Sequence, residues 1–223
     1  FADPPLRLDR LGDDRAGGVG DRGPGGVDIA EGHEGDRPEE GAEAVAGFGI
    51  ATRVEAFALI VIMALSASIG PFVGQNWGAQ LYHRVHTAIR QSFLFCIFWG
   101  VLLTLILAAS SEQIATAFDQ NPNVVAIAAS YLTLVPVSYG TMGLMFIASS
   151  TFNALGKPLP SLMMTITRML LLYVPLAYLG SLWWGVKGIF AAACIANLLV
   201  GIGAYFWTCK TWQLRSADPV VIE

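Results

Sequence analysis

Residues 87–110 read TAIRQSFLFCIFWGVLLTLILAAS, an apolar run that contains a single charged side chain, Arg90. A helix needs about 20 apolar residues to cross about 30 Å of hydrocarbon, so this run is long enough to span a bilayer. Alternating strands are not seen, and helices are the remaining structure that pairs its own backbone groups inside a membrane. Similar runs on both sides predict an all-α membrane protein with five transmembrane helices, at about 45–72, 87–110, 124–152, 159–183 and 185–208.

Composition also indicates a membrane protein. Hydrophobic residues make up 54% of the 223 residues and the mean hydropathy is +0.56, which leaves too little polar surface to cover a water-soluble globule. Charge is concentrated near the start, because residues 1–42 have a net charge of −6 and the rest of the chain has a net charge of +2. Cys96, Cys194 and Cys209 lie singly in or beside apolar runs, so we expect no disulfide and no metal site.

The first 42 residues differ sharply from the rest. They are rich in Gly, Asp, Arg, Pro and Glu and have no periodic apolar face, which predicts a disordered acidic tail. The expected segments are this tail, a membrane lobe over residues 43–215 and a cytoplasmic tail over 216–223. The abrupt change near Ala42 is what a reading-frame slip would produce, and an ordinary acidic extension is the alternative. On the first interpretation a helix is missing before Val45, and the upstream DNA would encode it in another frame.

The loops predict the orientation, because short cytoplasmic loops collect Lys and Arg. Arg84 and Arg90 follow the first predicted helix, Glu112 and Asp119 follow the second, and Lys157 follows the third. The alternation continues to a basic C-terminal segment. We therefore expect a multi-pass protein of the plasma (inner) membrane with a cytoplasmic C-terminus.

Two motifs resemble turns of a known transporter family. The first ends the run VAGFGIATRVEAFALIVIMALSASIGPFVGQNWGA, as a Gly-Gln-x-x-Gly-Ala turn formed by Gly74, Gln75, Gly78 and Ala79. The second lies in FNALGKPLPSLMMTITRMLLLYVPLAYL, as an Asn-x-x-Gly turn formed by Asn153 and Gly156. In this order and spacing, the motifs make residues 45–209 similar to the MATE (multidrug and toxic compound extrusion) transporters.

That resemblance implies twelve helices in two six-helix lobes, of which this chain supplies helices eight to twelve in the C-terminal lobe. It implies export of cationic or amphipathic compounds in exchange for H⁺ or Na⁺, with no other cofactor. The N-terminal lobe is then a missing partner, and the fragment alone is expected not to transport. The segment AASYLTLVPVSYGTMGLMFIASSTFNAL has no acidic residue, so it does not support the Na⁺ site that one branch of the family has on this helix.

Charged residues inside the predicted membrane helices are costly, and such residues usually face a cavity or a partner. Arg53 and Glu55 are interpreted as a cavity-lining pair that attracts a cation, or as an interfacial pair in which the arginine reaches the headgroups. Because they are two positions apart, they are expected to contact different neighbours. Arg168 lies deep in its predicted helix and needs an acceptor. On one interpretation it binds backbone carbonyls or Glu55 inside the bundle. On the other it acts directly on a substrate or ion.

The third predicted helix has polar and methionine side chains at helical spacing, which suits a pocket for varied amphipathic ligands. Packing through small polar residues is the alternative. The candidate cavity residues on this helix are Tyr131, Ser138, Tyr139, Met142 and Met145. Pro136 removes a backbone donor close to Gly140, so we expect a bend and a hinge there, and we interpret Pro175 on the next helix in the same way.

The function that the sequence favours is a multidrug efflux antiporter of the MATE type, present here as an incomplete piece. An inactive or regulatory membrane fragment is the alternative. An enzyme is not expected, because HExxH, GxSxG and paired-acid helix motifs do not occur. The expected partners are membrane lipid, small amphipathic or cationic substrates and the missing lobe, and no nucleic acid.

Overall fold

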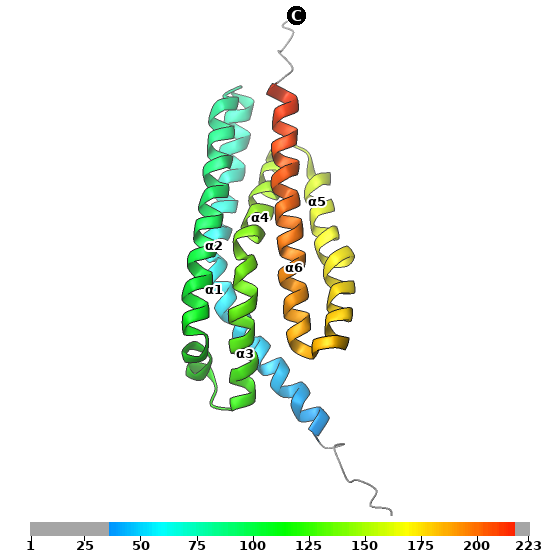
Figure 1. Cartoon of the computed structure of the whole chain (residues 1–223). Helices are drawn as coiled ribbons and strands as arrows, with labels where there is room; N and C mark the ends of the chain where they lie inside the picture. Colours follow the sequence, from blue (N-terminus) through cyan, green and yellow to red (C-terminus); the bar gives the residue numbers. More distant parts are fainter. Residues whose placement is uncertain (1–35, 217–223) are drawn as a thin grey trace, which may run out of the picture. The chain divides into compact units, whose positions relative to one another are not determined.

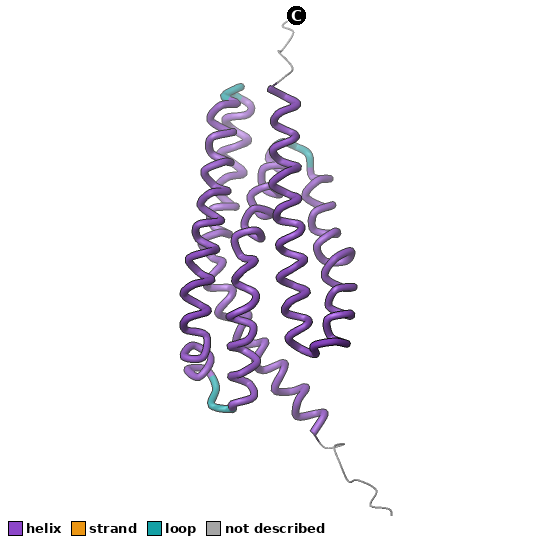
Figure 2. The backbone as a smooth tube through the Cα atoms, viewed as in Figure 1, coloured by secondary structure: helices purple, strands orange, loops and turns teal. Residues whose placement is uncertain are grey.

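A computed structural model describes the backbone of residues 36–216 and the side chains of residues 41–211. Figures 1 and 2 show that this part of the chain is a bundle of helices joined by short turns at its two ends. The elements are α1 (Asp36–Gly78), α2 (Tyr82–Phe118), α3 (Pro122–Leu134), η1 (Val135–Ser138), α4 (Tyr139–Ala154), α5 (Pro158–Ile166), η2 (Thr167–Tyr173) and α6 (Val174–Ser216). The predicted all-α membrane class is confirmed.

In the described part of the chain, four helical runs are long and apolar enough to cross a membrane, namely Gly41–Gly78, Tyr82–Phe118, Pro122–Ala154 and Pro158–Thr211. The sequence predicts five helices, and the difference lies in the last run. Gly185 there has a φ of 57° and a ψ of −135°, and Figure 1 shows the chain turning back at this point into an antiparallel limb. A Cβ on Gly180 would lie 2.5 Å from the carbonyl oxygen of Gly188, so glycine permits the two limbs to touch. The fourth run is therefore a helical hairpin, and its two limbs correspond to the predicted helices at about 159–183 and 185–208.

The structure extends the first helix into residues that the sequence assigns to the tail. Helix α1 begins at Asp36, whereas the predicted tail ends at residue 42. The sequence DRPEE at this start has a proline and three acidic residues, and both features favour a helix N-terminus. The expected disorder of residues 1–35 and the predicted tail over residues 217–223 lie outside the described residues.

Helix α4 lies at the centre of the bundle, where it packs against α1, α2, α5 and α6. Glycines let the neighbouring backbones approach it closely. A Cβ on Gly100 of α2 would lie 2.3 Å from the backbone nitrogen of Gly140, and a Cβ on Gly201 of α6 would lie 2.2 Å from the carbonyl oxygen of Thr141. In lipid, apolar side chains gain little from leaving the bilayer, so close packing of this kind holds helices together. The start of α4 is thus clamped between α2 and α6.

Hydrogen bonds between helices add to this packing. Ser66 Oγ of α1 donates to the carbonyl of Phe146 in α4 at 3.1 Å, and Ser150 Oγ of α4 donates to the carbonyl of Ser66 at 2.7 Å. Trp99 Nε1 of α2 donates to the carbonyl of Ala58 in α1 at 3.3 Å. Each donor is satisfied inside the bundle, which avoids the cost of an unpaired polar group in hydrocarbon.

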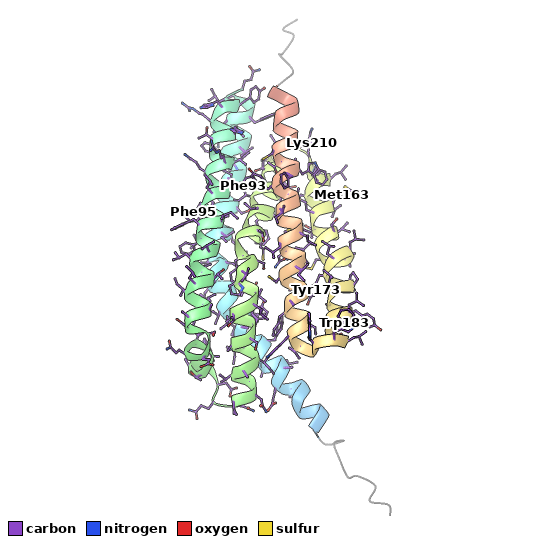
Figure 3. The ribbon with its side chains drawn as sticks, in the orientation of Figure 1. Phe93, Phe95, Met163, Tyr173, Trp183 and Lys210 are labelled. Atoms are coloured by element: carbon purple, nitrogen blue, oxygen red, sulfur yellow. The ribbon has the colours of Figure 1, made fainter. Side chains whose placement is uncertain are left out.

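The two ends of the bundle differ in charge. The turns after α1 and α4 and the end of α6 lie at one end, and the turn after α2 and the reversal at Gly185 lie at the other (Figures 1 and 2). Figure 3 marks these ends with Lys210 and Trp183. We call the end with the turns after α1 and α4 the basic end. Its described side chains include Arg84, Arg90, Lys157 and Lys210 and no carboxylate. The other, the acidic end, has Glu43, Glu112, Asp119 and Lys187.

The clamp on α4 can be tested by adding a side chain to α6. Gly201→Leu forces α6 away from α4, because even its Cβ would overlap the carbonyl of Thr141. Overpacking of this kind costs about 1–3 kcal/mol. We therefore expect the melting midpoint of the purified chain in detergent to fall by several degrees.

The matched control is Gly203→Leu, because nothing lies within 4 Å of a Cβ at Gly203. This variant should melt like the unmodified chain. Equal midpoints for the two variants would show that α4 is not held by this contact.

Candidate functional site

Polar side chains from separate helices meet inside the bundle. We call this group the central polar cluster, and its members are Glu55 of α1, Tyr131 of α3, Ser138 of η1, Tyr139 of α4, Arg168 of η2 and Asn197 of α6. Hydrogen bonds connect most of its members, and electrostatic interactions connect Glu55 with Tyr139 and Arg168. The cluster therefore joins six elements of the fold, namely α1, α3, η1, α4, η2 and α6.

Glu55 is the carboxyl group of the cluster. Tyr131 Oη donates to Glu55 Oε2 at 2.5 Å, although the two residues are 76 positions apart in the sequence. A carboxylate inside a membrane helix is expensive, and a hydrogen bond to a charged group contributes about 1.5–3 kcal/mol, so this bond offsets part of the cost. The bond uses one carboxyl oxygen of Glu55, and the other has no hydrogen bond to a described residue.

Aromatic rings surround the tyrosine. The ring centroid of Tyr131 lies 4.9 Å from that of Phe190 and 5.7 Å from that of Phe48, both in edge-to-face geometry. Tyr131 is 5% exposed and Phe190 is 3% exposed. This apolar cover holds the phenol in one orientation and keeps the hydrogen bond to Glu55 away from competing partners.

Arg168 heads a chain of hydrogen bonds. Its Nη1 donates to Asn197 Oδ1 at 3.2 Å, and Asn197 Nδ2 donates to Ser138 Oγ at 3.1 Å. Ser138 Oγ in turn donates to the carbonyl of Val135 at 2.8 Å. The expected partner Glu55 interacts with Arg168 electrostatically, and the hydrogen-bond acceptor is Asn197. The positive charge is therefore held by two different neighbours.

Asn197 is a cluster member that the sequence analysis does not name. It is 7% exposed and bridges Arg168 and Ser138. The signal for it was a single amide side chain in the apolar run AAACIANLLVGIGAYF. A buried amide in a membrane helix needs partners, and that rule would have placed Asn197 toward the interior.

The backbone that carries Arg168 is irregular. Arg168 lies in η2, a π-helical stretch at whose end the Val174 N–H donates to the carbonyl of Met169, five residues earlier. Pro175 follows directly, and a proline has no N–H and crowds the carbonyl four residues before it, which favours the wider turn. The irregularity expected at Pro175 is thus a π turn, and its role as a hinge stays a prediction.

The backbone that carries Ser138 is irregular as well. Residues Val135–Ser138 form the 3₁₀ turn η1, which contains Pro136. Thr104 Oγ1 of α2 donates to the carbonyl of Pro136 at 2.9 Å, and Gly140 follows at the close contact with Gly100. This junction of α3 and α4 is therefore supported from the side by α2, and the hinge role of Pro136 and Gly140 stays a prediction.

Two polar atoms of the cluster are buried without a hydrogen-bond partner in the described part of the chain. They are the Tyr139 hydroxyl and Arg168 Nε. Both residues interact electrostatically with Glu55, so both atoms belong to the surroundings of the same carboxyl group. Within the described residues, the cluster thus holds two unpaired donors that interact with one carboxyl group.

Other predicted cavity residues lie elsewhere. Arg53 has an exposed side chain on α1, in agreement with the expectation that it and Glu55 have different surroundings. Met145 is buried in the apolar core and Met142 packs against that core. The structure thus brings Glu55, Tyr131, Ser138, Tyr139 and Arg168 together, and it leaves Arg53, Met142 and Met145 in other surroundings.

The two family motifs lie at the basic end. Gly74, Gln75 and Gly78 belong to the last turns of α1. The helical hydrogen bonding continues to Ala79, whose N–H donates to the Gln75 carbonyl at 3.1 Å. The left-handed residue of this turn is the next one, Gln80, with a φ of 60°. In the second turn Gly156 has a φ of 68°, and its N–H donates to the Asn153 carbonyl at 3.0 Å. A glycine favours that conformation because it has no Cβ.

The chain is similar to known membrane transporters. The model of the MatE family matches residues 39–179, which is more than half of the chain. The FAD transporter of Shewanella oneidensis is 40% identical over 180 residues, which are 79% of this chain and 40% of that relative. The multidrug export protein MepA of Staphylococcus haemolyticus is 25% identical over 166 residues, which are 74% of this chain and 36% of that relative.

Solved structures of MATE transporters also match this chain. The bent form of the Vibrio cholerae MATE transporter VcmN is 27% identical, with a TM-score of 0.73 over 77% of this chain and 39% of that one. An outward-facing multidrug resistance MATE family transporter has a TM-score of 0.74 at 20% identity, a likeness that supports the fold alone. The chain spans about two fifths of the length of the first of these relatives. With its family match, its close relative and its helical architecture, the chain belongs to the MATE family of transporters.

Proposed function

We propose that this chain is the C-terminal lobe of a MATE-type efflux antiporter, which exports cationic or amphipathic compounds in exchange for H⁺ or Na⁺. The multidrug export protein among its relatives supports this class of substrate. The observation that carries the proposal is the hydrogen-bonded Glu55 inside an apolar bundle. A buried carboxylate in a membrane helix is costly to retain, and a site for a proton or a cation is a common reason for such a residue.

The proposal includes a location and a partner. The membrane is the plasma (inner) membrane, and the basic end with the C-terminus faces the cytoplasm, because Lys and Arg collect on that side. The partner is a second, N-terminal lobe that faces this one across a substrate cavity. An inactive or regulatory fragment without transport is the alternative, and joining the chain to its other lobe and measuring efflux would separate the two.

A second candidate substrate is a flavin dinucleotide. The relative at 40% identity is named a FAD transporter, and Arg168 Nε is a buried donor without a partner in the described part of the chain. A guanidinium group binds phosphate oxygens in a fixed geometry, which suits a dinucleotide better than an organic cation. On this candidate function, Arg168 contacts the exported molecule and Glu55 binds the coupling ion.

The role of Glu55 can be tested in the complete carrier. Glu55→Gln keeps the size of the side chain and a hydrogen-bonding oxygen, but it removes the negative charge that would bind a proton or cation. We expect ethidium efflux from cells to fall at least about tenfold, since a charged hydrogen bond contributes about 1.5–3 kcal/mol. Surface abundance should remain unchanged.

The matched control is Glu112→Gln, because Glu112 is an exposed carboxylate of α2 at the acidic end of the bundle. Its efflux should equal that of the unmodified carrier. Full efflux by Glu55→Gln would exclude Glu55 from ion coupling.

The role of Arg168 separates the two substrate classes. Arg168→Gln removes the guanidinium group, so we expect export of FAD into the medium to fall much further than ethidium efflux, which uses no phosphate contact. Arg168→Lys should restore FAD export only in part, because a lysine lacks the planar fork of donors. Arg53→Gln is the control, since Arg53 is exposed on α1. Equal losses for both substrates would indicate that Arg168 acts through the fold and not through phosphate binding.

A further inference from the structure

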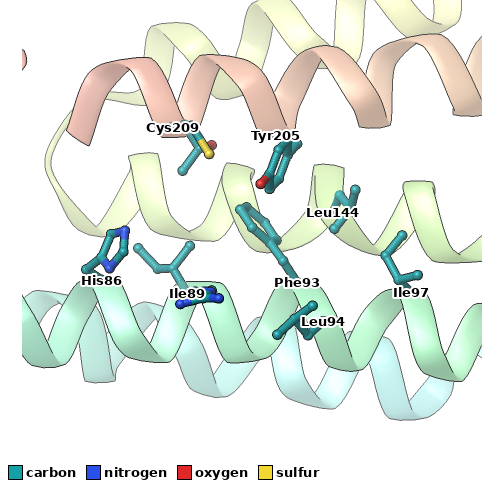
Figure 4. A pocket seen from close by; sticks show the side chains of 10 residues that line it. His86, Ile89, Phe93, Leu94, Ile97, Leu144, Tyr205 and Cys209 are labelled. Carbon is teal, nitrogen blue, oxygen red and sulfur yellow. The ribbon is translucent and has the colours of Figure 1, made fainter. Parts of the chain in front are cut away.

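A groove opens between α2 and α6 at the basic end, away from the central polar cluster. Its volume is about 600 Å³. Figure 4 shows Phe93 and Tyr205 pointing toward each other across it, and their ring centroids are 5.6 Å apart in edge-to-face geometry. The groove thus has aromatic side chains from both helices near its middle.

One part of the groove is apolar. Phe93, Leu94, Ile97 and Leu144 line this part. Phe93 and Leu144 are each 5% exposed, whereas Leu94 is 61% exposed and Ile97 is 41% exposed. The inner wall is therefore buried in the bundle, and the outer wall belongs to the apolar surface of α2 that meets the bilayer.

The other part of the groove is polar and basic. His86 and Arg90 line it from α2, and Thr208 and Cys209 line it from α6. Arg90 also interacts electrostatically with Tyr205 across the groove. The groove therefore changes from basic to apolar along α2.

Arg90 has no nearby counter-charge among the described residues. The only carboxylates on α2 and its following turn are Glu112 and Asp119, and Glu112 is 22 residues from Arg90, which corresponds to about 33 Å along the helix. Glu43 lies at the acidic end, and Glu55 belongs to the central polar cluster. A cation at the membrane boundary without a carboxylate partner is available to an anion from outside the chain.

We propose that this groove binds an anionic phospholipid. The phosphate group contacts Arg90 and His86, and an acyl chain lies along Phe93, Leu94 and Ile97. Lipid is the solvent of this surface, and basic pockets between membrane helices are known to take anionic headgroups. The charge of Arg90 repels the organic cations of the first proposed function. The exposed apolar wall of Leu94 and Ile97 meets the bilayer and fits an acyl chain better than the flavin dinucleotide of the second, so we assign the groove to lipid.

The test uses the 223-residue chain, freed of phospholipid in a neutral detergent. Its melting midpoint is measured with added phosphatidylglycerol, phosphatidylcholine or inorganic phosphate. A ligand that binds the folded state alone raises the midpoint as its concentration rises. We expect phosphatidylglycerol to raise it, and the other two to leave it unchanged.

Substitutions then locate the effect. Arg90→Gln should weaken the apparent affinity for phosphatidylglycerol about tenfold, because a charged hydrogen bond to phosphate is lost. Arg90→Lys should retain most of it, since the charge remains. Arg84→Gln is the matched control, because it removes the same charge from the same end but Arg84 does not line the groove.

Four results would overturn the proposal. Equal stabilisation by phosphatidylcholine would remove the anionic specificity, and stabilisation by inorganic phosphate would indicate a free-anion site. An equal loss in Arg84→Gln would indicate diffuse surface charge. If Arg90→Gln does not fold, native mass spectrometry of the unmodified complete carrier decides the matter, and failure to retain phosphatidylglycerol over phosphatidylcholine would reject the site.

Discussion

The hydrogen bond from Tyr131 to Glu55 joins α1 to α3 in a region where a bilayer offers no water to either group. That lack of water constrains the whole bundle. Apart from Tyr139 Oη and Arg168 Nε, the buried side-chain donors and acceptors of the described residues find a partner. The helices therefore cannot rotate or slide independently without breaking pairs such as Ser150 with Ser66. The close glycine contacts around α4 set how near the helices come, and the polar pairs set which faces meet.

The same constraint explains why the irregular backbone lies beside the cluster. The turns η1 and η2 interrupt regular helical bonding inside the membrane, and such interruptions are tolerated where protein groups satisfy the freed positions. Thr104 supports the carbonyl of Pro136, and Ser138 supports the carbonyl of Val135. Asn197 then ties η1 to η2 through Ser138 and Arg168, so two bends on different helices share one set of hydrogen bonds.

The sequence predicts the membrane class because apolar length depends on local composition alone. It also identifies Glu55, Tyr131 and Arg168 as polar residues in apolar surroundings. It does not predict their partners, because the pairs are far apart in the chain and depend on helix rotation. Asn197 was missed because one amide in an apolar run is a weak signal. The two limbs that meet at Gly185 were predicted as separate helices, because each is long enough to span, and the structure has a helical limb on either side of that residue. The π turn before Pro175 was expected only as a bend, since sequence does not fix which hydrogen bonds replace the lost one.

In the proposed exchanger, the pairing of Arg168 with Glu55 gives a physical route from ion binding to helix movement. A proton or cation on Glu55 removes the attraction for Arg168 or replaces it with repulsion, and either change is large in a low-dielectric interior. Arg168 stands on the π turn η2, which Pro175 favours, so a change in its interactions acts where the helix is already irregular. Arg168 also binds Asn197, which binds Ser138, so a shift of the Arg168 side chain alters the hydrogen bonding at the bend of η1. In this proposal, charge at Glu55 and the two irregular turns are linked through the side-chain amide of Asn197.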